Sequence, residues 1–210
     1  WSAGGTAYQM DFVYDAAGRP LAMYYRSKTA GQTDFNGDSY YYETNQQGDV
    51  TGLYKITYNA TTKALSATRV ASYEYDAWGN VTYSTGEMAD INPLRYRGYY
   101  QDWESGYYYL QSRYYDPAIG RFINADSYAS TGEGFLGHDM FAYCGNDPVN
   151  SSDSTGAMRT YDAGGFAYSG GSASSHGSQG FTTLIAQALE ALGLHSIAEG
   201  ILLSTAATIS

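Results

Sequence analysis

The sequence predicts a mainly β protein, a meander of short hairpins that together form a curved sheet. Composition is the first indication, because tyrosine occurs 24 times and glycine 25 times, against only 4 prolines. Aromatic side chains suit the half-buried faces of strands, and glycines suit the tight corners between them. A turn motif that recurs along the chain is the second indication. With 210 residues, the chain is long enough for a sizeable core.

The recurring motif is a turn that begins with Asp or Asn and ends with Gly. Residues 14–18 (YDAAG) recur as 75–79 (YDAWG), and residues 42–48 are a looser copy with the same three-residue offset. The side chain of Asp or Asn accepts hydrogen bonds within the turn, and Gly takes the left-handed conformation. Each copy predicts a hairpin that must stack on its neighbours to bury a face. The predicted turn residues are Asp15 with Gly18, Asn45 with Gly48, and Asp76 with Gly79.

Two more turns are predicted in the tyrosine-rich stretch 92–126. The first is acidic and closed by glycine, and the second combines a proline, which fixes one backbone angle, with a glycine, which permits a positive one. Aromatic residues flank both turns, and residues 107–115 are expected to form one strand between them. Their turn residues are Asp102 and Gly106 in the first, and Asp116, Pro117 and Gly120 in the second.

Charge and cysteine content narrow the classes of function. The formal net charge is -10 and the 11 basic residues form no long run, which does not favour a nucleic-acid partner. Cys144 is the single cysteine, so an internal disulfide and a multi-cysteine zinc site are excluded, and a buried apolar role is expected. The sequence indicates no cofactor or metal. It also lacks an uninterrupted apolar run of membrane-spanning length.

Changes in composition and periodicity along the sequence predict three regions. Residues 1–157 carry the β pattern, and residues 158–180 turn to Gly, Ser and Ala, which is typical of a flexible linker. Residues 181–210 show helical periodicity, with a break at Gly193 that predicts a short helical hairpin. The chain begins at Trp1 without an initiator Met and ends inside an apolar helical pattern, as expected of a piece of a longer protein.

The residues between Arg95 and Gly156 resemble the core segment that closes Rhs (YD-repeat) proteins, and the recurring Tyr-Asp turns are similar to the repeats of that family. The resemblance implies a fragment of a β-shell that encapsulates and presents a C-terminal toxin. The expected partners are that toxin, the remaining repeats of the shell and an immunity protein. It also implies a secreted or cell-surface location, with any export signal on sequence not included here.

The same resemblance implies a candidate self-cleavage site. Two Asp-Pro-x-Gly-Leu-like motifs of the family match here at Asp126 and Asp153, with cleavage after Ala157. Two neighbouring carboxyl groups cannot both ionise cheaply, so one can polarise a peptide carbonyl while the other activates water. This sequence departs from the motifs, because Ser127 and Ser154 stand where the family has Pro, and Ala157 stands where it has Leu.

Three functions therefore remain open from the sequence. The first is a structural segment of the toxin-carrying shell, in which both Asp residues only stabilise turns. The second is an aspartic autoprotease that releases the C-terminal effector, with Asp126 and Asp153 as the catalytic pair. The third, supported more weakly, is a surface protein that binds carbohydrate through exposed tyrosines.

Overall fold

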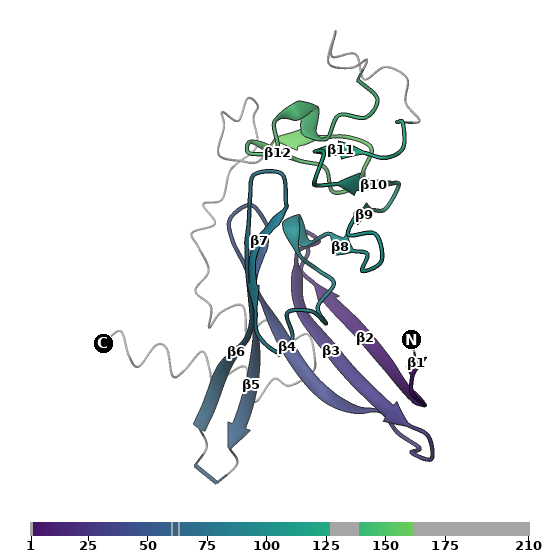
Figure 1. The fold of residues 1–210 in the computed structure, drawn as a ribbon. Coiled ribbons are helices and arrows are strands. Elements are labelled where there is room, and N and C mark those ends of the chain that lie inside the picture. Colours follow the sequence, from purple (N-terminus) through teal and green to yellow (C-terminus); the bar gives the residue numbers. More distant parts are fainter. Residues whose placement is uncertain (1, 60, 63, 127–138, 162–210) are drawn as a thin grey trace, which may run out of the picture. The chain divides into compact units, whose positions relative to one another are not determined.

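The computed structural model describes residues 2–59, 61–62, 64–126 and 139–161. Within that part of the chain the protein is almost entirely β, with strands in three sheets (Figure 1). In the largest sheet each strand lies next to its neighbour in the sequence, in the order β1-β2-β3-β4-β5-β6-β7. Its strands are β1 (Ser2–Ala3), β2 (Thr6–Tyr14), β3 (Pro20–Thr29), β4 (Asn36–Thr44), β5 (Val50–Asn59), β6 (Ala64–Tyr75) and β7 (Val81–Thr85).

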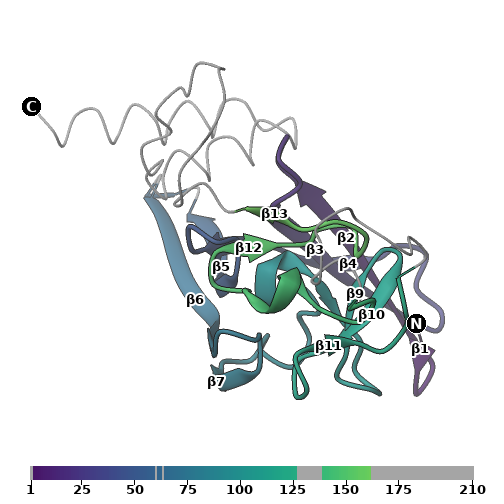
Figure 2. The same cartoon turned by 90° about the horizontal axis from the view of Figure 1, so that it is seen from above.

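Two smaller sheets follow, with the strand orders β11-β10-β9-β8 and β12-β13. Figure 2 shows β9, β10 and β11 beside one another. No helix in the described ranges is long and apolar enough to span a membrane. The elements are η1 (Tyr96–Gly98), β8 (Tyr100–Gln101), β9 (Tyr108–Leu110), β10 (Arg113–Asp116), β11 (Arg121–Phe122), η3 (Cys144–Asn146), β12 (Ser151–Ser152) and β13 (Thr160–Tyr161), where η denotes a 3-10 helix.

The mainly β meander predicted from the sequence is confirmed, with one correction. Residues 107–115 are not a single strand but the hairpin β9–β10, which pairs Tyr109 with Tyr114. The chain reverses at Gln111, which has a φ of 61°, and the Ser112 amide donates to the carbonyl of Leu110. The turn is polar and lies between aromatic runs, yet it lacks the Gly that marks the other turns. The predicted helical hairpin (181–210) and most of the predicted linker (158–180) lie outside the described residues.

The described residues fall into two compact units, one within residues 2–43 and 53–69 and the other within residues 44–52 and 70–161. In the first unit, β2 and β3 pair antiparallel along their length, with an irregularity at Val13 and Tyr14. The buried side chains of this unit include Ala22, Met23, Tyr40, Tyr41, Tyr42 and Leu53, and Pro20 at the start of β3 is buried as well. Two surface ion pairs, Arg69 with Glu43 and Lys55 with Asp38, contribute little to stability because water screens them.

The three repeated turns share one geometry. At the last copy, the Asp76 carboxylate accepts hydrogen bonds from the amides of Trp78 and Asn80, each at 2.9 Å. The Gly79 amide donates to the Asp76 carbonyl at 3.1 Å, and Gly79 has a φ of 89°. The other two copies make the corresponding bonds, with Asp15 accepting from Ala17 and Arg19, Asn45 accepting from Gln47 and Asp49, and Gly18 and Gly48 at positive φ.

The two turns in the tyrosine-rich stretch use the same chemistry. Asp102 accepts a hydrogen bond from the Ser105 amide, and Asp116 accepts one from the Ala118 amide. Gly106 and Gly120 close these turns with φ values of 77° and 66°. The carbonyl of Pro117 accepts a hydrogen bond from the Asn80 side chain, so the second turn is joined to the turn that contains Asp76.

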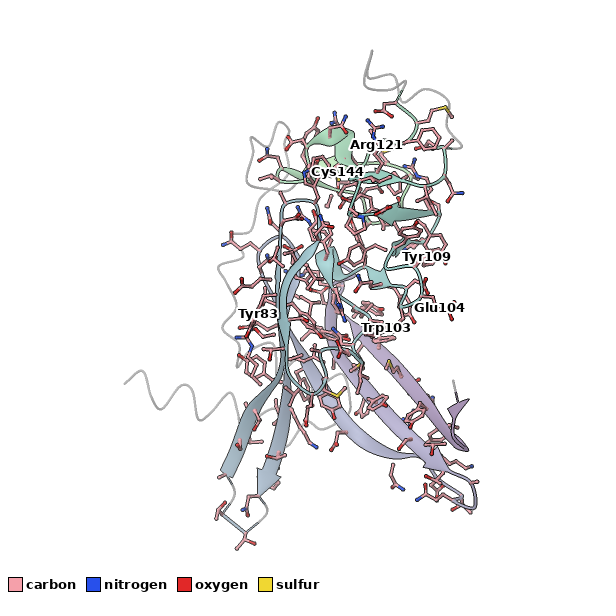
Figure 3. The ribbon with its side chains drawn as sticks, viewed as in Figure 1. Tyr83, Trp103, Glu104, Tyr109, Arg121 and Cys144 are labelled. Carbon is pink, nitrogen blue, oxygen red and sulfur yellow. The ribbon has the colours of Figure 1, made fainter. Side chains whose placement is uncertain are left out.

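The second unit is built on a buried aromatic core. Its rings touch at centroid distances as short as 4.1 Å, between Tyr115 and Tyr143. Cys144 lies within this core, as the sequence predicts, whereas Trp103 and Tyr109 are exposed (Figure 3). The core residues are Tyr96, Tyr99, Tyr108, Leu110, Tyr115, Phe122, Tyr143 and Cys144.

Three hydroxyls of this core bind one turn of the chain. Tyr96 donates to the carbonyl of Ala77, Tyr115 to that of Trp78 and Tyr108 to that of Gly79, at distances of 2.6 to 2.9 Å. A buried carbonyl without a partner costs about 1–3 kcal/mol. Tyrosine therefore fills the core with a ring and also satisfies the carbonyls of the turn at residues 76–79, which phenylalanine could not do.

Glycine at position 79 is expected to matter more than glycine at position 48. Both have nearly the same φ, 89° and 90°, so alanine should cost each about 1–2 kcal/mol of backbone strain. A Cβ on Gly79 would lie 2.6 Å from the ring of Tyr96, whereas a Cβ on Gly48 would meet nothing within 4 Å. We expect Gly79→Ala to lose about 1–3 kcal/mol more than Gly48→Ala in urea unfolding. Equal losses would show that the ring contact contributes nothing.

Alkali is expected to unfold the second unit. Burial raises the pKa of Tyr96 to about 12, and it also raises the pKa values of Tyr75, Tyr99, Tyr108 and Tyr115 above the ordinary 10.0. Because the folded state holds these protons more tightly, its stability is fully present below about pH 10 and falls as the pH rises towards 12 and above. Tyrosinate absorbance should therefore rise together with the loss of near-ultraviolet circular dichroism. Ionisation of the core with the dichroism intact would contradict this expectation.

Candidate functional site

The structure brings Asp126 and Asp153 to one buried arginine. Asp126 follows β11, and its amide donates to the carbonyl of Met140 at 2.9 Å. Asp153 follows β12 and is 2% exposed. Nη2 of Arg113 lies 3.0 Å from Oδ2 of Asp126 and 3.7 Å from Oδ2 of Asp153. The two carboxylate oxygens therefore cannot lie farther apart than those two distances added together.

Arg113 is held in place by more than its two carboxylates. It belongs to β10, on the same side of the strand as the buried Tyr115, and its guanidinium carbon lies 3.6 Å from the centroid of the Phe122 ring. Its Nη1 donates to the carbonyl of Met140 at 3.0 Å, and its Nε donates to the carbonyl of Gly156. One side chain thus joins β10 to the segments that carry the two acids.

The Asp153 carboxylate reaches the peptide bond at which cleavage is predicted. Its Oδ1 accepts hydrogen bonds from the amides of Thr155 and Ala157, each at 3.2 Å, and from the amide of Met158 at 3.3 Å. The Met158 nitrogen belongs to the peptide bond that follows Ala157. The carboxylate and this bond are therefore side by side, and the carbonyl of Gly156, one residue before Ala157, is bound by Arg113.

The electrostatics of the site follow from burial and from its mixed charges. Burial lowers the pKa of Arg113, and the negative charges of Asp126 and Asp153 oppose that shift. A cation between two carboxylates offsets their mutual repulsion, which is otherwise strong in a site shielded from water. The site thus brings together two carboxyl groups, one guanidinium cation and a peptide bond, and carboxyl groups are able to perform acid–base chemistry on a backbone. The described residues include no cluster of His, Cys, Asp and Glu that could hold a metal ion.

Arg113 was absent from the site predicted from the sequence. The available indication was strand alternation, because Arg113 lies two residues before Tyr115 and therefore faces the same side of β10. A charged residue that faces a core requires an opposite charge or several acceptors. Alternation could have shown that Arg113 needs partners, but it could not have shown that Asp126 and Asp153 are these partners.

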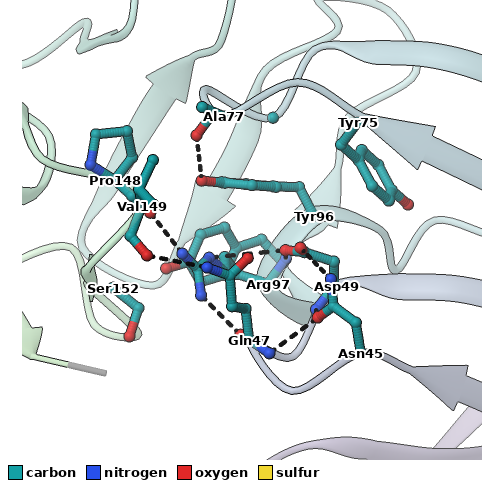
Figure 4. A network of polar contacts seen from close by, with 12 residues as sticks. Asn45, Gln47, Asp49, Tyr75, Ala77, Tyr96, Arg97, Pro148, Val149 and Ser152 are labelled. Atoms are coloured by element: carbon teal, nitrogen blue, oxygen red, sulfur yellow. Dashed lines mark hydrogen bonds and ion pairs between the residues drawn. The ribbon is translucent and has the colours of Figure 1, made fainter. Parts of the chain in front are cut away.

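The segment that leads to Asp153 is bound by the second repeated turn and by the loop around η1 (Figure 4). Nη1 of Arg97 donates to the carbonyl of Gln47, and Nη2 donates to the carbonyl of Pro148 at 2.5 Å. The Arg97 amide donates to the Asp49 carboxylate at 3.0 Å, and the Gln47 side chain donates to the carbonyl of Val149 at 2.9 Å. These contacts connect residues 45–49 with residues 148–151.

Comparison with known proteins relates the chain to toxins. No protein-family model matches it. It is 37% identical over 139 residues to the tRNA3(Ser)-specific nuclease WapA of Bacillus spizizenii, which covers 64% of this chain and 6% of that protein. It is 36% identical over 100 residues to the double-stranded DNA deaminase toxin A of Burkholderia cenocepacia, covering 46% of this chain and 7% of the toxin. The chain thus spans only a small part of the length of these relatives.

A solved structure shares the fold. The TcdB2–TccC3 structure without its hypervariable C-terminal region matches with a TM-score of 0.57 and 22% identity. The match covers 72% of this chain and 7% of the other. At this identity the likeness is one of fold. The relation to toxin proteins rests on the sequence matches, to which the solved structure adds a likeness of fold.

Arg113 is expected to be important for stability because its removal leaves buried acids without a counter-charge. We expect Arg113→Met to lower the free energy of unfolding by about 3–5 kcal/mol. Adding Asp126→Asn should recover part of that loss, which a double-mutant cycle in urea would measure. The control is Arg121→Met, because Arg121 and Asp139 form a 3.0 Å pair at the surface, and its loss should stay below about 1 kcal/mol. Equal losses at the two arginines would contradict the expected role of burial.

Proposed function

We propose that this chain is a segment of the β-repeat shell of a toxin-carrying Rhs-type protein, exported or displayed at the cell surface. The meander supports this proposal because each hairpin pairs with the next one along the chain and a shell can be extended in this way. The sequence matches to a nuclease and a deaminase toxin support the link to a C-terminal effector. The remaining repeats, that effector and an immunity protein would be its partners.

We also propose that the site around Arg113 cuts the chain between Ala157 and Met158. The observation that carries this proposal is the hydrogen bond from the Met158 amide to the Asp153 carboxylate, 3.3 Å long. The carboxylate is thereby placed at the nitrogen that must leave when the peptide bond breaks. Asp126, which shares Arg113 with Asp153, supplies the second carboxyl group that such a reaction needs.

The chemistry proposed is hydrolysis by two carboxyl groups. Water adds to the carbonyl carbon of Ala157, the bond to the Met158 nitrogen breaks, and the nitrogen leaves as an amine. One carboxyl group takes a proton from the water and the other gives a proton to the amine, so that protons balance. Asp153 contacts the leaving nitrogen and must be protonated when the reaction begins, so that it can give this proton to the amine. Asp126 must begin as the carboxylate, which takes the proton from the water. Arg113 binds the carbonyl of Gly156, the residue before Ala157, and so fixes the segment that would be cut.

A purely structural role is the second candidate, and the same contacts favour it. Arg113 joins β10 to the segments that contain Asp126, Met140, Asp153 and Gly156. Holding these segments together would by itself explain why the protein buries an arginine with two carboxylates. In that case both carboxylates anchor loops, and no bond is cut. The two candidates make opposite predictions for the integrity of the chain.

The test is to follow the full-length natural protein on denaturing gels and to sequence the N-terminus of any fragment that forms. We expect a fragment that begins at Met158, and we expect Asp126→Asn and Asp153→Asn each to abolish it while circular dichroism stays native. Asp139→Asn is the matched control, because Asp139 also pairs with an arginine at 3.0 Å, but its carboxylate binds Arg121 and the Phe141 amide instead of Arg113. Its fragment should form at the wild-type rate.

Two results would refute the cleavage. In the first, the wild-type chain stays whole for days at several pH values, and the structural role then holds. In the second, a fragment appears but both Asp variants still produce it, which would assign the cut to another protease.

A further inference from the structure

The hydroxyl of Tyr99 binds the backbone of Asp153 on both sides of its Cα. It donates to the Asp153 carbonyl at 2.9 Å and accepts from the Asp153 amide at 3.2 Å. It also lies 3.2 Å from the hydroxyl of Tyr143, which can donate to it. A phenolic hydroxyl has one proton to donate and two lone pairs, so these three contacts use its full capacity. Burial raises the pKa of Tyr99, which keeps the hydroxyl neutral and able to donate.

Arg97 binds the same segment a few residues earlier. Its Nη2 contacts the carbonyls of Pro148 and Ser151, at 2.5 Å and 3.5 Å. The Arg97 side chain is only 3% exposed, and Nε lies 3.6 Å from the Asp49 carboxylate. Arg97 itself has a φ of 53°, an uncommon conformation for a residue other than glycine, which the surrounding contacts stabilise.

We propose that Arg97 and Tyr99 form a positioning clamp that sets the Asp153 carboxylate against the Met158 amide. The proposal rests on the cleavage proposed above and adds residues that touch neither the peptide bond nor the carboxyl groups. The clamp binds the backbone at residues 148, 151 and 153, so the Asp153 side chain starts from a fixed Cα. A catalytic group misplaced by about 1 Å can lose about 100-fold in rate, so this restraint determines activity.

The clamp also explains why Tyr99 differs from the other tyrosines of the core. The hydroxyls of Tyr96, Tyr108 and Tyr115 bind the turn at residues 76–79, whereas the hydroxyl of Tyr99 binds Asp153 itself. Tyr108 and Tyr99 are both almost fully buried, at 0% and 7% exposure. Removing either hydroxyl takes away a hydrogen bond to the backbone, but the Tyr108 hydroxyl binds the carbonyl of Gly79, whereas the Tyr99 hydroxyl binds the residue of the candidate site. Tyr96 is not used for this contrast, because its hydroxyl also bonds the side chain of Arg97.

This contrast defines the experiment, in which Tyr99→Phe and Tyr108→Phe are compared in the full-length protein. We expect Tyr99→Phe to slow formation of the Met158 fragment about 10-fold or more, and Tyr108→Phe to leave the rate within about twofold of wild type, both far below the melting temperatures. The second readout is hydrogen exchange at the Ala157 and Met158 amides, measured by NMR in an Asp126→Asn background. Tyr99→Phe should speed it, and Tyr108→Phe should not.

Each outcome has a definite meaning. If Tyr99→Phe cleaves as fast as Tyr108→Phe, or if exchange at Ala157 and Met158 is the same in both, the clamp is refuted. If the wild-type chain never cleaves, the proposed function fails, and the exchange data alone decide whether Tyr99 positions Asp153. If Tyr99→Phe does not fold, Gln47→Ala takes its place. Gln47 is exposed, and it binds the carbonyl of Val149 in the same segment, so its loss should slow cleavage and speed the same exchange.

Discussion

Backbone carbonyls that lie against the aromatic core impose the constraint on which the second unit depends. In the turn at residues 76–79, the carbonyl of Gly79 is bound in a buried hydrogen bond, and those of Ala77 and Trp78 are bound in part-buried ones. The hydroxyls of Tyr96, Tyr115 and Tyr108 supply the missing hydrogen bonds. Each unpaired carbonyl would cost about 1–3 kcal/mol, which is a large share of the stability of a small domain. The abundance of tyrosine therefore follows from the need for rings that also carry a donor.

The same constraint leads to the candidate site. Tyr99 belongs to this core. Its hydroxyl binds the backbone of Asp153, whereas the other three hydroxyls bind the turn at residues 76–79. Arg113 enters from β10 and packs on Phe122, another member of the core. The aromatic cluster thus excludes water from one side of the ion pairs, which strengthens the attraction between Arg113 and the two carboxylates. The aromatic core, the Tyr99 hydroxyl and the charge of Arg113 all contact the segment of residues 153–156 or the side chains bound to it.

The departures from the family motif have a physical interpretation in this structure. Ala157 contributes its amide to the Asp153 carboxylate, and a backbone amide is the same whether the side chain is Ala or Leu. Ser154 stands in place of a proline, yet the turn is held by the amides of Thr155, Ala157 and Met158 on a single carboxylate oxygen. The contacts on which the proposed chemistry rests therefore involve neither the missing proline ring nor the missing leucine side chain.

Local chemistry was enough to predict much of this protein from its sequence. Asp76 and Gly79 mark a turn because their properties act within four residues, and the alternating tyrosines mark strands for the same reason. The sequence also singled out Asp126, Asp153 and the peptide bond after Ala157, by resemblance to a family. It could not show that the strand expected at residues 107–115 reverses at Gln111, because no glycine or proline marks that turn.

Contacts between distant residues were decided only by the tertiary structure. Arg113 meets Asp126 and Asp153, which lie 13 and 40 positions later in the sequence, and no local pattern specifies such a meeting. The hydroxyl of Tyr99 binds Asp153 because the packing of the aromatic core brings the residue before β8 next to the residue after β12. Turn chemistry acts over a few residues and can be inferred from them, whereas a site made of several segments exists only once the core has brought those segments together.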